Sequence, residues 1–138
     1  MPRIYEIHDT ILHGIDRGDA QLVVNLCAIR TEFDESGGSP SRLHKQEVRL
    51  TFRDAVMETD SQNLPNWLLN GSFACESCTA DSADIVDGEI PVSLARATNV
   101  DVRLEGMNEE TQEYISIQIN APIMTLEAFG EPEFIQEF

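Results

Sequence analysis

The segment Cys75-Glu76-Ser77-Cys78 has a spacing at which two thiolates can hold one metal ion or form a redox disulfide. A zinc site needs two more ligands, and the sequence has no second Cys-x-x-Cys and no His-x-His. These ligands would have to be Cys27 and one histidine (His8, His13 or His44), if the fold brings them together. We therefore favour structural cysteines without a metal ion or cofactor, and expect no stoichiometric zinc in the purified protein.

His8 and Asp9, with His13 close by, offer imidazole and carboxylate groups for acid–base chemistry. A general base without a nucleophile is weak support for catalysis, and serine-nucleophile, phosphate-loop and dinucleotide motifs are all missing. We assign no catalytic residue and expect a non-enzyme. Asp9 is expected to accept backbone N–H bonds in a turn between two strands.

The clearest element is a long strand over residues 113–128. Residues 114–120 alternate polar and β-branched side chains, which is the period of a half-buried strand. Past Pro122 the apolar positions change from odd to even numbers. A proline beside such a change predicts a bulge or bend, which lets a small sheet curl.

Two other strands, Gln21 to Glu32 and Glu47 to Arg53, show the same alternation. Arg49 and Arg53 should face outward and pair with glutamates across strands, which we favour over an anion site. The predicted core consists of alternating apolar side chains from the three strands: Leu22, Val24, Leu26, Val48, Leu50, Phe52, Ile115, Ile117 and Ile119.

One stretch, Leu64 to Gly71, predicts a short helical turn, with Pro65 in its first turn and Gly71 at its end. It carries the single tryptophan, Trp67, which we expect over an opening of the core, as a pocket candidate. About eight short strands with turn signals and one helical turn predict an all-β fold, an antiparallel barrel or half-barrel in a single domain over residues 1–138.

Charge gives the one functional signal. Nine Lys plus Arg stand against 25 Asp plus Glu, for a net charge of −16, and residues 54–138 hold −15 of it. Such a surface disfavours nucleic acid and anionic membranes as partners. It suits a basic protein partner, and we take Glu109, Glu110 and Glu113 as candidate partner-binding residues. A bias toward soluble, acidic proteins explains the composition as well.

The first residues lack the apolar core of a signal peptide, and the longest apolar run is too short to span a bilayer. With an odd number of cysteines, three, this predicts a cytoplasmic protein with reduced thiols. The sequence leaves open whether the protein forms a homo-oligomer.

Three further features support a resemblance: His8-Asp9-x-x-Leu12, the alternating strand from Gln21, and the segment Leu50 to Val56. The chain resembles a largely uncharacterised group of small bacterial all-β proteins over roughly residues 8–56. That group has lipocalin-like barrel members and includes predicted immunity proteins of contact-dependent toxin systems. Ala55 between Asp54 and Val56, and the Cys75/Cys78 pair, depart from its pattern, and no catalytic residues are implied.

The function expected is that of a cytoplasmic, non-enzymatic binding protein that meets a basic partner through an acidic surface, as an immunity-type inhibitor does. The alternative is a small-molecule carrier that uses a barrel interior. An apolar pocket lined by Trp67 would favour the carrier, and an interior filled with side chains would favour partner binding.

Overall fold

The computed structural model describes residues 3–33, 40–79, 89–91 and 96–137. Every regular element in them is a strand, so the all-β prediction is confirmed, with nine strands rather than about eight. The strands are β1 (Arg3–Gly18), β2 (Gln21–Phe33), β3 (Pro40–Arg53), β4 (Val56–Thr59), β5 (Trp67–Ala74), β6 (Ser77–Thr79), β7 (Glu89–Pro91), β8 (Arg96–Asn108) and β9 (Glu113–Glu137). No helix that could cross a membrane occurs in these residues.

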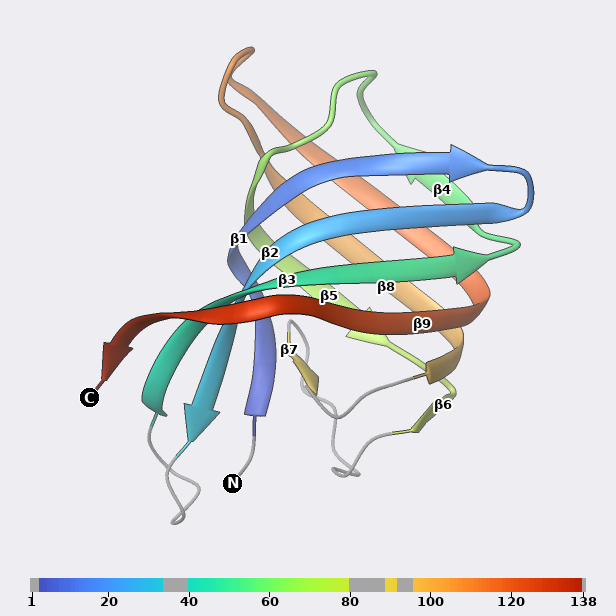
Figure 1. Cartoon of the computed structure of the whole chain (residues 1–138). Coiled ribbons are helices and arrows are strands. Elements are labelled where there is room, and N and C mark those ends of the chain that lie inside the picture. Colours follow the sequence, from blue (N-terminus) through green and yellow to red (C-terminus); the bar gives the residue numbers. More distant parts are fainter. Residues whose placement is uncertain (1–2, 34–39, 80–88, 92–95, 138) are drawn as a thin grey trace.

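The strands form one antiparallel sheet that curls until it meets itself (Figure 1). Its order is β4-β9-β3-β2-β1-β5-β8-β6, with β7 beside β1. Because β8 also pairs with β9, the path from β9 through β3, β2, β1 and β5 to β8 closes in a ring. A closed path leaves few free edges, which protects the sheet from pairing with other chains.

The long strand β9 closes this ring by changing partners along its length. Its first half pairs with β8 and β4, and from Ile123 onward it pairs with β3. Figure 1 shows the sharp bend between the two halves. The buried side chains change from Ile119 and Ala121 to Met124 across Pro122, as predicted. The β8–β9 register stays continuous past Pro122, so the feature is a bend and not a bulge.

The core fills the inside of the ring. All nine side chains predicted for it are buried, each 5% exposed or less. Leu68 and Phe73, which the alternation did not reveal, are also buried in the core, as is Met124 beyond the bend. Each such side chain contributes roughly 1.5–3 kcal/mol by leaving water.

The predicted helical turn at Leu64 to Gly71 is wrong, because residues 67–74 form strand β5 between β1 and β8. The glycine does not end a helix. A Cβ on Gly71 would stand 2.5 Å from the Arg103 carbonyl oxygen and 2.6 Å from Cγ2 of Ile7. Gly71 therefore allows the backbones of β5 and β8 to approach closely.

The turn expected around Asp9 is also wrong. β1 runs without interruption from Arg3 to Gly18, and the turn into β2 lies at Asp19 and Ala20. Asp9 has a φ of 63° and lies where the β1–β2 register shifts, between Glu6 and Ile11. It therefore belongs to a bulge inside one strand.

Candidate functional site

The candidate residues Glu109 and Glu110 lie in the turn between β8 and β9, at the upper left of Figure 1. Side-chain oxygens of two asparagines hold the turn's backbone. Asn108 Oδ1 accepts bonds from the amides of Glu110 and Thr111, each 3.0 Å long, and Asn66 Oδ1 accepts one of 2.8 Å from the Glu109 amide. Within the described residues, neither glutamate carboxylate makes a hydrogen bond or ion pair. The turn thus presents two exposed charges on a fixed backbone.

The third candidate, Glu113, has a structural role beside this turn. Its carboxylate accepts bonds from Ser61 Oγ (2.8 Å) and Asn63 Nδ2 (2.6 Å), which hold the connection between β4 and β5. These hydrogen bonds, Ser61 first, lower the pKa of Glu113 below its ordinary 4.5. Glu113 is therefore less available to a partner than Glu109 and Glu110.

Further carboxylates surround the turn. β4 and β8 lie on either side of the first half of β9, and Tyr114 Oη donates to Glu105 on β8 (2.8 Å). Residues 56–60 and 103–118, which form this part of the sheet and its turns, contain one basic residue, Arg103. We call this region the acidic end; its carboxylates are those of Glu58, Asp60, Glu105, Glu109, Glu110 and Glu113.

The pocket candidate Trp67 does not cover an opening of the core. Trp67 is 37% exposed, its Nε1 donates to Asp9 Oδ1 (3.4 Å), and its cross-strand neighbours are Ile11 on β1 and Met107 on β8. In the described part of the chain, the apolar cavity beside Tyr5 and Leu50 measures about 10 Å³. That is room for about one water molecule. Trp67 does not line it.

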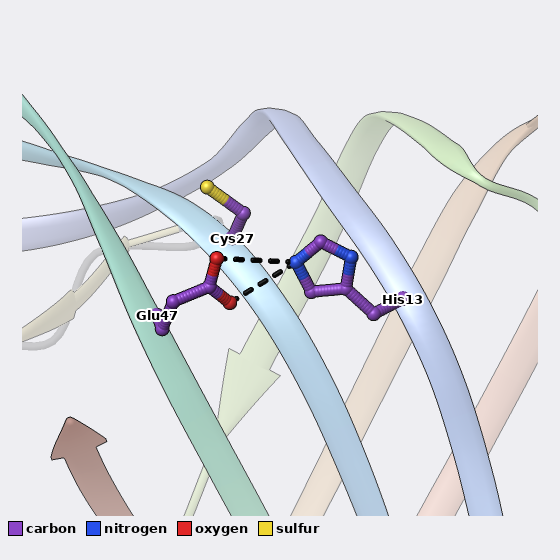
Figure 2. A group of neighbouring side chains, drawn as sticks. All are labelled: His13, Cys27 and Glu47. Atoms are coloured by element: carbon purple, nitrogen blue, oxygen red, sulfur yellow. Dashed lines mark hydrogen bonds and ion pairs between the residues drawn. The ribbon is translucent and has the colours of Figure 1, made fainter. Parts of the chain in front are cut away.

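A second group, the His13 cluster, consists of His13 on β1, Cys27 on β2 and Glu47 on β3 (Figure 2). Each residue offers one atom that could bind a metal ion, and these three atoms lie within 4.8 Å of one another. His13 Nε2 is 3.0 Å from Glu47 Oε2 and 3.3 Å from Oε1. His13 and Glu47 are partly exposed, and Cys27 is a half-buried free thiol.

The burial of Cys27 raises the pKa of its thiol, and the Glu47 carboxylate beside it raises that pKa further. Cys27 therefore stays protonated at neutral pH. Glu133 also raises the thiol pKa, and Lys45 opposes these effects.

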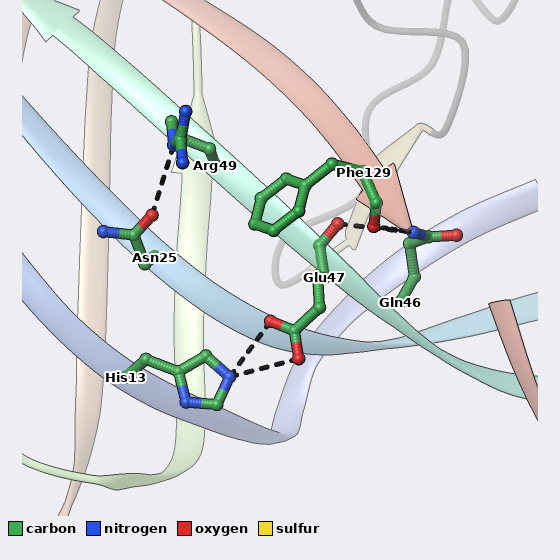
Figure 3. Close-up of polar contacts among 6 residues, drawn as sticks. All are labelled: His13, Asn25, Gln46, Glu47, Arg49 and Phe129. Atoms are coloured by element: carbon green, nitrogen blue, oxygen red, sulfur yellow. Dashed lines mark hydrogen bonds and ion pairs between the residues drawn. The ribbon is translucent and has the colours of Figure 1, made fainter. Parts of the chain in front are cut away.

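Arg49 lies next to this cluster on β3 but does not pair with a glutamate as predicted. Arg49 Nε donates to Asn25 Oδ1 (3.3 Å), and its guanidinium lies 5.1 Å from the ring centre of Phe129 (Figure 3). In place of the expected ion pair with a glutamate, Arg49 thus makes a hydrogen bond to the side-chain amide of Asn25 and a cation–π contact with Phe129. The buried Gln46 donates a hydrogen bond from Nε2 to the Phe129 carbonyl oxygen (2.8 Å), which holds β9 beside Glu47.

The structure assembles the other predicted groupings only in part. His8 pairs with Asp9 (2.9 Å), both side chains being more than half exposed, whereas His13 turns to Glu47. Cys75 is disulfide-bonded, which departs from the expectation of reduced thiols, and the side chain of Cys78 lies outside the described residues. Of the residues considered as metal ligands, the fold brings together Cys27 and His13; within the described residues, His8, His44 and Cys75 do not belong to that group.

Sequence reasoning missed Glu47 as a neighbour of His13. The two are 34 residues apart, and only the register of β1, β2 and β3 makes them neighbours. Comparisons with protein-family models, with curated proteins and with solved structures give no match to this chain. The case for a function therefore depends on the geometry alone.

Proposed function

We propose that this protein is a non-enzymatic binding protein whose acidic end meets a basic partner protein. The observation that carries the proposal is the pair Glu109 and Glu110, exposed on a backbone held by Asn66 and Asn108. A turn whose backbone is already held needs no reordering of that backbone when a partner arrives. Such a surface increases the rate of association more than the final affinity.

The filled interior supports this proposal over the carrier. A ligand pocket typically measures roughly 300 Å³ or more. Among the described residues, the apolar cavity beside Tyr5 and Leu50 measures about 10 Å³, and a larger hollow of about 380 Å³ lies on the outer face beside Asn25 and Arg49. Trp67, the residue expected to line a pocket, is hydrogen-bonded to Asp9 on the outer surface.

Within this proposal, the protein acts as an immunity-type inhibitor of a basic toxin domain. The lipocalin-like grouping belongs to the same proposal, and the closed antiparallel ring is compatible with it. The net charge of −16 supports a cationic partner over nucleic acid or an anionic membrane.

A capture experiment from the native host tests the proposal. The parent chain and a Glu109→Gln/Glu110→Gln variant are used as baits, with Glu127→Gln/Glu131→Gln as a matched control. The control removes the same charge from exposed positions on the second half of β9.

We expect the parent and the control to retain one basic protein that the Glu109→Gln/Glu110→Gln variant retains less at low salt. Equal capture by all three baits, or capture of no basic protein, would remove the case for the acidic end.

A further inference from the structure

The expectation of no zinc was drawn from the spacing of Cys75 and Cys78 and did not include Glu47; contrary to it, we propose that the His13 cluster is a binding site for a zinc-type divalent metal ion on the outer face of β1, β2 and β3. This site is separate from the acidic end and does not depend on the proposed partner. The inference starts from the ligand chemistry, since the cluster offers one imidazole nitrogen, one sulfur and one carboxylate group.

These three donors suit zinc, which binds cysteine sulfur, histidine nitrogen and carboxylate oxygen in tetrahedral sites. Three protein ligands leave the fourth position to water. Because His13 and Glu47 are exposed by nearly half, solvent reaches that position.

The distances permit such a site. Bonds of about 2.0–2.3 Å to a tetrahedral ion place ligand atoms on the order of 3.5 Å apart. The three donor atoms already lie within 4.8 Å of one another, and His13 Nε2 is 3.0 Å from Glu47 Oε2. Small rotations of exposed side chains supply the remaining adjustment, without movement of the backbone.

A bulge in β1 positions the histidine. Leu12 pairs with Leu26 and Gly14 pairs with Asn25, so His13 is an extra residue without a partner on β2. Bulges redirect side chains and occur often beside functional sites. From here His13 reaches over β2 to a carboxylate on β3, as Figure 2 shows.

Apolar side chains flank the cluster on both sides. Ile11 is the cross-strand neighbour of Cys27, and Phe129 is that of Glu47. Both are large, exposed apolar residues, 41% and 40% exposed. As directly opposed residues of antiparallel strands, each lies on the same face of the sheet as the ligand beside it, and apolar neighbours limit the access of solvent to a metal site.

Binding must displace one proton. Cysteine binds metal ions as the thiolate, so the Cys27 thiol has to lose its proton. When its sulfur binds the ion, the thiol proton passes to the buffer, and the S–H bond is replaced by a metal–sulfur bond. Affinity should therefore rise with pH.

The test is a titration of the metal-free full chain with Co²⁺, which gives a thiolate-to-metal charge-transfer band when bound to cysteine. A Cys75→Ser/Cys78→Ser background leaves Cys27 as the one thiol. We expect one equivalent of Co²⁺ to produce the band and Zn²⁺ to remove it. In that background His8→Gln, which changes an exposed histidine outside the cluster, should bind like its parent.

Cys27→Ser should abolish the band, and His13→Gln or Glu47→Gln should weaken binding by at least the ~10–100-fold typical of an outer-shell change. Urea unfolding of each variant without metal checks that it folds. A second readout needs no substitution at the site: Zn²⁺ should raise the unfolding midpoint of the background chain. A missing band, a band indifferent to His13→Gln and Glu47→Gln, or no midpoint shift would overturn the proposal.

Discussion

Ile117 and Pro122 lie on the same strand, and their expected contributions to stability differ. Ile117 is fully buried, so Ile117→Ala should lower the free energy of unfolding by ~2–5 kcal/mol through lost contacts and a cavity. Pro122 is exposed at the bend, and Pro122→Ala should cost under ~1 kcal/mol. Urea unfolding measures both. Equal losses for the two variants would contradict the assignment of Ile117 to the core and of Pro122 to a tolerant bend.

Glu113 should make stability depend on pH. Hydrogen bonds from Ser61 and Asn63 lower its folded-state pKa below 4.5, so the carboxylate stabilises the fold above that value. The contribution is lost as the pH falls through the folded-state pKa. The unfolding free energies of the parent and Glu113→Gln should thus differ at pH 7 and converge at lower pH. A difference that stays constant down to pH 3 would show that these bonds do not act through the charge.

At the scale of elements, the close contact between β5 and β8 should tolerate no added side-chain atom. A Cβ on Gly106 would overlap the Trp67 carbonyl oxygen and lie 2.9 Å from the Leu68 Cα. Gly106→Ala should therefore destabilise the fold by ~1–3 kcal/mol or more, because backbone must move.

The control is Gly14→Ala in β1, where an added Cβ meets nothing within 4 Å. It should be close to neutral in the same thermal unfolding measurement. A neutral Gly106→Ala would mean that β5 and β8 are less closely packed than the structure has them.

The elements readable from the sequence are those with uninterrupted alternation. β2, β3 and the first half of β9 follow the period of two, and the nine apolar core residues predicted on them are all buried. β5 was not, because its register shifts between Leu68 and Asn70 and the buried positions move from even to odd. Gly71 allows β5 and β8 to approach each other closely, but in the sequence a glycine at this position resembles the end of a helix.

At the scale of the whole molecule, closure into a ring could be anticipated only in part. Pro122 and the change of parity predicted a bend, but the partners of each half of β9 depend on pairings far apart in the sequence. The His13 cluster could not be predicted for the same reason. A bulge at His13 and the register of three strands are needed before His13, Cys27 and Glu47 become neighbours.

The acidic end was anticipated as a charge asymmetry, and the structure adds which carboxylates are free to act. Glu113 is bonded to Ser61 and Asn63, whereas the carboxylates of Glu109 and Glu110 make no such bond within the described residues. Exposed charges act over a Debye length of about 10 Å at 0.1 M salt. Their effect should therefore appear in the association rate at low salt.

The association rate with the captured basic partner, measured by stopped flow at low and physiological ionic strength, tests the central claim most directly. We predict that Glu109→Gln/Glu110→Gln associates severalfold more slowly than the parent at low salt, with a flatter salt dependence. Glu127→Gln/Glu131→Gln should stay close to the parent. Equal rates for the parent and the Glu109→Gln/Glu110→Gln variant at low ionic strength would contradict the account and leave the acidic end without a role in binding.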